Sequence, residues 1–382
     1  MSLQRSQPLL TLEAGRFFAA TAVVLFHYTG VVHDFRGVNV FGDLFRPGHV
    51  GVPYFFVLSG FIIYHVHRDD IGRPGTIARF AAKRAIRLMP MFWMISLVML
   101  AGFLLSPGLL GKRELTFPGV IADLLLLPHA NAILSISWTL RHEMVFYALF
   151  ALALWLGRPA FGLIAIWIAL SLVGSAFSLD VDSLGLLSLV GSGLNLGFGL
   201  GILVAIAVLR RSVAPAGLWI VAGGGGLLAL CAAEWLIGRG TSHDIAILGA
   251  WGGVAYLIAA AVLIYGLVRF EAGRTLPAAG LWKMLGGASY LLYLVHQPLA
   301  SAAFRVVPPL KTMAPELAFI LLTAAAIVVA LLGHLLVEKP ILAFLSGQFT
   351  QRSGATRQVP GDGSGGVGYA SSPQHPPKLA DR

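Results

Sequence analysis

Long apolar runs separated by short polar stretches dominate the chain. A helix that crosses the hydrocarbon core of a bilayer needs about 20 mostly apolar residues, and runs of this kind recur along most of the sequence. We therefore predict an all-α integral membrane protein, a polytopic bundle of about ten transmembrane helices. The predicted spans are residues 11–30, 48–67, 88–107, 138–157, 160–177, 187–209, 216–237, 246–268, 284–303 and 316–338.

The distribution of Lys and Arg orients this bundle. Most of the cations fall in the segments that are cytoplasmic if the chain starts inside, and cytoplasmic loops carry an excess of Lys and Arg. An even number of spans then places both termini in the cytoplasm. Residues 120–128 form a further apolar stretch that is too short to span, and we expect it to be re-entrant or interfacial.

Three regions follow from this pattern. Residues 1–10 form a cytoplasmic N-terminus, and residues 11–340 form one membrane domain without a soluble insertion. Residues 348–382 are rich in Gly, Ser, Pro and Gln and lack apolar periodicity, which predicts a disordered cytoplasmic tail.

Composition excludes several classes of protein. The chain is 57% hydrophobic and 12% charged with a mean hydropathy of +0.81, which a soluble globular fold does not tolerate. The net charge of +10 comes from scattered cations, so we expect topology rather than nucleic-acid binding to explain it. Cys231 is the only cysteine, so an intrachain disulfide and a Cys-based metal site are excluded.

The first span carries three residues that a bilayer disfavours, namely Glu13, Arg16 and His27. Arg16 and His27 are eleven residues apart, which is close to three helical turns, so they share a face about 16 Å apart. Arg16 would lie toward the cytoplasm and His27 toward the outside. The alternative is that Glu13 and Arg16 are an interfacial i,i+3 pair and that His27 only caps the helix.

Two later spans carry polar groups as well. Trp138, Arg141 and Glu143 open the fourth span, near the depth expected for His27, and a carboxylate there can orient an imidazole. A structural salt bridge between Arg141 and Glu143 is the alternative. In the ninth span, Tyr290, Tyr293 and His296 recur every three residues along one stripe, although Tyr and His are also common at membrane interfaces.

A cluster of cations precedes the third span and contains Lys83, Arg84 and Arg87. Such a cluster can bind a phosphorylated anion that arrives from the cytoplasm, or it can reflect topology alone. The group formed by His65, His67, Asp69 and Asp70 has metal-ligand residue types, but we expect no metal site because no further ligands lie nearby in the sequence.

Together these pieces resemble the acyltransferase-3 family of membrane O-acyltransferases. The resemblance covers residues 10–340, and its motifs lie at residues 12–16 with His27, 51–61, 83–90, 137–147, 289–296 and 338–340. The exopolysaccharide-production branch of the family is the most similar. Family members commonly have Asp and Leu where this chain has Glu13 and Gly15, and the soluble esterase-like domain of some members is absent.

The resemblance implies an enzyme of the bacterial cytoplasmic (inner) membrane that transfers an acyl group, by default acetyl, from acyl-CoA to a hydroxyl of a cell-surface or exported glycan. It implies that Arg84, Arg87 and Arg16 hold the phosphates of CoA, that His27 is the general base and that Glu143 orients His27. We expect further substrate contacts from Trp138, Arg141, Tyr290, Tyr293 and His296.

The implied partners are acyl-CoA as donor substrate, with no cofactor bound permanently, a glycan or lipid-linked glycan, the lipid bilayer and polysaccharide assembly machinery. Neutral imidazole at pH 7 suits a general base, and a covalent acyl-histidine is the competing route. The alternative function is a multi-span transporter or flippase for a lipid-linked sugar, since polar groups inside a membrane also line permeation paths. A non-catalytic scaffold within a polysaccharide assembly complex is a third alternative. It is disfavoured because a scaffold needs no buried Arg or His.

Overall fold

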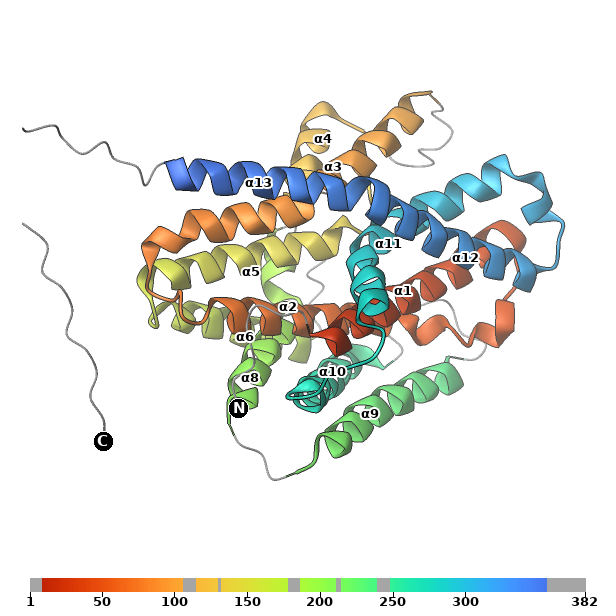
Figure 1. The fold of residues 1–382 in the computed structure, drawn as a ribbon. Helices are drawn as coiled ribbons and strands as arrows, with labels where there is room; N and C mark the ends of the chain where they lie inside the picture. The colour runs from red at the N-terminus through yellow and green to blue at the C-terminus, as the bar shows by residue number, and fades with distance from the viewer. Residues whose placement is uncertain are drawn as a thin grey trace, which may run out of the picture.

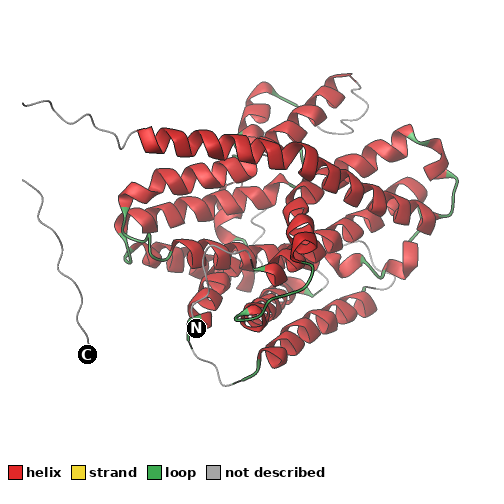
Figure 2. Ribbon diagram, viewed as in Figure 1, coloured by secondary structure: helices red, strands yellow, loops and turns green. Residues whose placement is uncertain are grey.

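The computed structural model describes residues 9–105, 115–129, 132–177, 186–210, 214–238 and 248–355. Within these residues the regular structure is entirely helical, as Figure 2 shows. The main helices are α1 (Leu10–Arg36), α2 (Gly51–His67), α3 (Ile77–Leu105), α4 (Phe117–Leu124), α5 (Ser137–Leu156), α6 (Ala160–Ala176), α7 (Leu186–Gly191), α8 (Leu196–Val208), α9 (Ala216–Ile237), α10 (Gly249–Glu271), α11 (Ala279–Val306), α12 (Pro315–Gly333) and α13 (Lys339–Ala355).

Short turns of tighter or wider helix join several of these elements. The 3-10 turns are η1 (Val40–Asp43), η2 (Arg46–Val50), η3 (Pro74–Thr76), η6 (Gly193–Asn195) and η7 (Pro308–Lys311). A π-helical turn, η8 (His334–Glu338), connects α12 to α13 without a break in the helix. This turn carries Glu338, which pairs with Arg87 of α3.

Seven helical segments of the described residues are long and apolar enough to cross a membrane. They begin at Leu10, Arg46, Pro74, Ser137, Ala216, Trp251 and Pro315. These segments indicate a multi-pass membrane protein. The count of ten spans and the cytoplasmic position of both termini remain predictions.

The three other predicted spans are helical but differ from a plain apolar span. Residues 160–177 form α6, a short apolar helix, and residues 187–209 are broken into α7, η6 and α8. Residues 284–303 lie in α11, whose Tyr, His and Gln side chains lower its hydropathy. Because the central part of α11 is buried against other helices, these polar groups face protein rather than lipid.

The predicted terminal regions are only partly described. Residues 1–8 of the predicted N-terminal region lie outside the described residues, as do residues 356–382 of the predicted tail. Helix α13 continues to Ala355, so the first residues assigned to the tail are helical.

The N-terminus of α1 is fixed by a carboxylate from α10. The backbone N–H groups of Leu10 and Thr11 donate to the two carboxylate oxygens of Glu271 at 2.6 and 2.8 Å, and the Thr11 hydroxyl donates to the same carboxylate at 2.7 Å. The first N–H groups of a helix have no intrahelical partner, and an anion there also suits the helix dipole. Glu271 therefore locks the start of α1 against α10.

Glycines allow α2 and α8 to touch along their backbones. A Cβ atom at Gly201 would lie 2.1 Å from the carbonyl oxygen of Val57, and one at Gly60 would lie 2.2 Å from that of Phe198. Small residues permit this approach where helices pack in a membrane. Gly60 and Gly201 therefore serve close helix contact.

Helices that are far apart in sequence meet around α1, α2 and α11. Helix α1 packs against α11, α2 and α12, α2 packs against α8 and α10, and α13 lies beside α3. Figure 1 shows α13 running across α11 toward α3, which brings the C-terminal helix next to the basic end of α3. This arrangement encloses the candidate site.

Candidate active site

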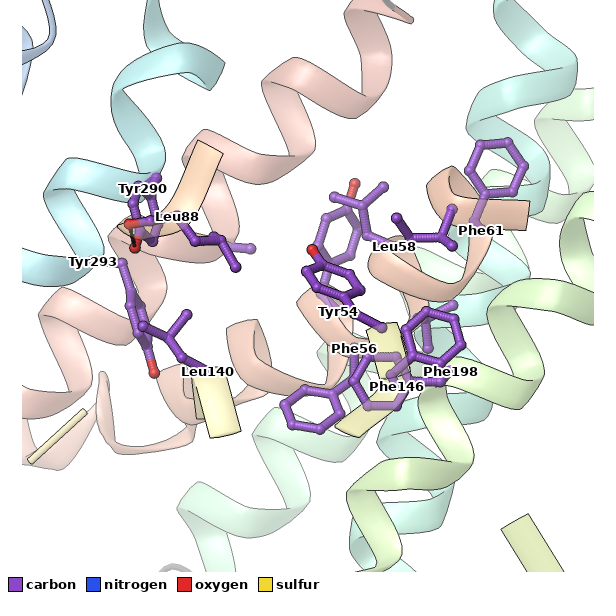
Figure 3. Close-up of a cluster of buried hydrophobic side chains, with 14 of the residues drawn as sticks. Tyr54, Phe56, Leu58, Phe61, Leu88, Leu140, Phe146, Phe198, Tyr290 and Tyr293 are labelled. Atoms are coloured by element: carbon purple, nitrogen blue, oxygen red, sulfur yellow. Dashed lines mark hydrogen bonds between the residues drawn. The ribbon is translucent and has the colours of Figure 1, made fainter. Parts of the chain in front are cut away.

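A cavity of about 490 Å³ lies between α1, α2, α3, α5, α8, α11 and α13. Its walls are mainly apolar, and in Figure 3 Leu88 and Leu140 lie on one side of an open space with Phe56 and Leu58 on the other. The structure brings six of the predicted site residues to this cavity, namely Arg16, Arg84, Arg87, Glu143, Tyr290 and Tyr293. Cavities that are largely apolar with a few polar groups are typical of small-molecule sites.

Arg84 is a half-buried cation in the cavity wall. Its Nε atom is buried and has no hydrogen-bond partner within the described residues, and its guanidinium carbon lies 6.0 Å from the ring centre of Tyr147. Lys83 lines the same end of the cavity and is exposed. A guanidinium that lines a cavity and has a buried N–H without a partner can bind a phosphate group.

Arg87 differs from Arg84 because it already has an anionic partner. Its guanidinium donates to Glu338 of η8, a carboxylate that is fully buried, and lies 5.3 Å from the ring centre of Tyr290. The other oxygen of Glu338 contacts Nδ1 of His334 at 2.8 Å. Arg87 therefore neutralises a buried carboxylate, a contact that the sequence analysis did not foresee.

Arg16 reaches the cavity from α1. Its nearest anionic partner is Glu13, one turn earlier in the same helix, at 3.6 Å. This is the i,i+3 pair that the sequence allows, and it does not keep Arg16 out of the cavity wall.

Glu143 makes contacts other than the one predicted for it. Its carboxylate accepts hydrogen bonds from Ser59, at 3.0 Å, and from Tyr147, and it lines the cavity. His27 has other partners, and no contact joins it to Glu143 within the described residues, so the role of Glu143 in orienting His27 stays a prediction. The rise per residue gives the depth of a side chain along its own helix, but it does not show which helices are neighbours.

His27 is held by α11 instead. Its Nδ1 atom lies 3.0 Å from the carbonyl oxygen of Val23 and 3.1 Å from Nε2 of His296. His296 is fully buried, and its Nδ1 lies 3.2 Å from the carbonyl oxygen of Leu292. The two imidazoles therefore form a pair at the interface of α1 and α11.

Tyr293 separates the cavity from this pair. Its ring centre lies 5.8 Å from that of His296, and its hydroxyl lies 3.0 Å from the Thr139 hydroxyl in the cavity wall. The ring of Phe55 packs against Tyr293 at 6.3 Å. Tyr293 and Phe55 thus line the cavity, and Tyr293 also packs against His296 outside its lining.

Arg141 and Trp138 lie away from the cavity. Arg141 donates to Asp123 at 3.0 Å and to the carbonyl oxygen of His129 at 3.1 Å. Trp138 is 40% exposed and packs its ring against His142. Direct substrate contacts at these two positions are therefore not supported by this geometry.

Asp123 was not singled out from the sequence. It is fully buried in α4 and also accepts from the backbone N–H of Ile133 at 2.9 Å and the Ser137 hydroxyl at 3.2 Å. Its only sequence signal was a carboxylate inside the apolar stretch at residues 120–128. Asp123 fastens α4 to the start of α5, and the Arg141–Glu143 salt bridge considered above is replaced by Arg141–Asp123.

The group with metal-ligand residue types does not converge. His67 Nδ1 lies 2.9 Å from Asp70, and Asp70 also lies 3.6 Å from Arg79. Across the described ranges, no three His, Cys, Asp or Glu side chains come together in a way that could hold a metal ion.

Comparison with known proteins bears on the chemistry of this cavity. The model of an acyltransferase domain family matches residues 9–337. The chain is also similar to the exopolysaccharide production protein ExoZ of Rhizobium meliloti (strain 1021), with 29% identity over 320 residues that cover 81% of this chain and 94% of ExoZ. No solved structure matches the chain.

Proposed function

Because this chain belongs to the acyltransferase-3 family, we propose that it transfers an acetyl group from acetyl-CoA to a hydroxyl of an exported glycan of the exopolysaccharide type. The family supports acyl transfer, and the similarity to ExoZ supports a role in exopolysaccharide production. Neither the family nor the similarity to ExoZ names the acyl group or its carrier, so acetyl and CoA are part of the proposal.

The observation that carries the proposal is one cavity with Arg84 and Tyr293 in its wall, next to the His27–His296 pair. Arg84, Lys83 and Arg16 would bind the phosphates of CoA, since their charges are not taken up by a buried carboxylate as that of Arg87 is. The apolar walls would accept the pantetheine arm and the acyl group. Tyr293 or Phe55 has to turn aside for the thioester to reach His27.

The hydrogen bonds around His27 fix where its proton sits. Neutral His296 donates from Nδ1 to the Leu292 carbonyl, so its Nε2 can only accept. His27 must then carry its proton on Nδ1, shared between Val23 O and His296 Nε2. This leaves the lone pair on Nε2 of His27, which is the form that a general base needs.

The reaction then balances without another reactant. The acceptor oxygen attacks the thioester carbonyl carbon while its proton passes to Nε2 of His27. The carbon–sulfur bond breaks, and the thiolate of CoA takes that proton from His27 as it leaves. The products are the acetyl ester and free CoA.

The test is transfer of radiolabelled acetyl from acetyl-CoA to host lipid-linked glycan by the purified chain in proteoliposomes. We expect label in the glycan together with an equal amount of free CoA. Movement of the glycan across the membrane without consumption of acetyl-CoA would instead identify a transporter and refute the proposal.

A further inference from the structure

A second histidine, His49, lies close to His27 and is oriented by a buried carboxylate. It has no part in the proposed acyl transfer. In η2, its Nε2 lies 2.8 and 3.0 Å from the two oxygens of Glu234, which is 1% exposed in α9. The Tyr256 hydroxyl of α10 donates to the same carboxylate at 2.7 Å. Because an ionised carboxylate accepts only, Nε2 of His49 must carry the proton of this contact.

The other ring nitrogen of His49 is available. Within the described residues Nδ1 makes no hydrogen bond, and the side chain is 15% exposed. Neutral His49 offers a lone pair at Nδ1, whereas protonated His49 offers an N–H there. A hydroxyl group suits both forms, since it both donates and accepts.

His49 lies next to the reacting imidazole. The ring of Phe26 is 4.9 Å from that of His27 and 5.6 Å from that of His49, so it packs against both imidazoles. A Cβ atom at Gly48 would lie 2.2 Å from the carbonyl oxygen of Ala22, so η2 is in close contact with α1 at a position five residues before His27. Two imidazoles beside one aromatic ring match a sugar, which presents several hydroxyls around an apolar ring face.

We propose that His49, Glu234 and Phe26 form a subsite for the acceptor sugar, in which Nδ1 of His49 binds a hydroxyl close to the one acylated at His27. This inference rests on the proposed function, because the site it describes is the acceptor half of that reaction. The competing role is structural, with the His49–Glu234 contact only fastening η2 to α9.

The variant His49→Gln separates the two roles. The Gln amide nitrogen reaches as far as Nε2 of His and can still donate to Glu234, so η2 stays attached, but no atom replaces Nδ1. Tyr256→Phe is the matched control, because it removes one hydrogen bond from Glu234 but keeps Nδ1 of His49 and the aromatic ring that packs against His49 at 5.6 Å. Melting temperatures of both variants show whether the fold is kept.

The experiment is calorimetric titration of each purified protein with an oligosaccharide released from the exopolysaccharide of the host. We expect His49→Gln to weaken the Kd about tenfold or more and Tyr256→Phe to change it less than threefold. Equal binding by His49→Gln and wild type, an equal loss in both variants, or no binding by wild type would each overturn the subsite. Release of CoA from acetyl-CoA is measured on the same samples. If the wild type binds the oligosaccharide but releases no CoA, the proposed acyl transfer is refuted and the sugar subsite is retained.

Discussion

His27 Nδ1 lies 3.1 Å from Nε2 of His296, so two histidines from α1 and α11 share one hydrogen bond beside the cavity. The carbonyl of His296 is itself held by the Tyr28 hydroxyl at 2.9 Å, which fixes the backbone behind the ring. His296 is thus in contact with His27 at the place where the sequence analysis expected Glu143. It is a neutral partner, in contrast to the carboxylate found in many catalytic triads.

The first prediction concerns this positioning role. His296→Leu removes the acceptor for the Nδ1 proton of His27, so kcat should fall about tenfold to a hundredfold while both KM values stay within twofold. His296→Gln supplies an amide oxygen in its place and should retain most of kcat. Steady-state CoA release gives these values, and equal losses in the two variants would mean that His296 only fills space.

The second prediction separates two neighbouring arginines of α3. Arg84→Gln should raise the KM for acetyl-CoA about tenfold or more without changing the melting temperature, because Nε of Arg84 has no hydrogen-bond partner to lose within the described residues. Arg87→Gln should lower the melting temperature, because it leaves the fully buried Glu338 without its cation. Donor kinetics and thermal unfolding in detergent test both. An unchanged KM in Arg84→Gln would remove Arg84 from the donor site.

The third prediction tests whether Glu143 orients His27 or only lines the cavity. Glu143→Gln keeps an oxygen that accepts from Ser59 and Tyr147, so we expect kcat to stay within about fivefold of wild type. If Glu143 oriented His27 as a triad carboxylate does, the same change would cost about 10⁴ in kcat. Single-turnover acetyl transfer resolves a difference of that size.

The sequence was sufficient for the helices and for much of the cavity. Apolar periodicity located helical segments at all ten predicted spans, and the motifs named Arg16, Arg84, Arg87, Glu143, Tyr290 and Tyr293, which the structure gathers in one cavity. Helical spacing also placed Tyr293 and His296 on one stripe of α11, and the structure keeps both rings close together.

The sequence could not predict which helices pack side by side. Rise per residue gives depth along a helix, but the choice between Glu143 and His296 as the partner of His27 depends on which helix packs against α1. Arg141 and Glu143 are two residues apart on α5 and so face different sides, which explains why Arg141 binds Asp123 while Glu143 faces the cavity. Glu338 was known only as part of a motif, and its ion pair with Arg87 requires α13 to return beside α3.

The most direct test of the central claim is acceptor-dependent release of CoA from acetyl-CoA by wild type, His27→Gln and the control His33→Gln, which lies further along α1. The account predicts that His27→Gln loses at least about 10² in turnover with an unchanged KM for acetyl-CoA, while His33→Gln behaves as wild type. Turnover by His27→Gln at the wild-type rate would contradict the account and remove His27 from the chemistry.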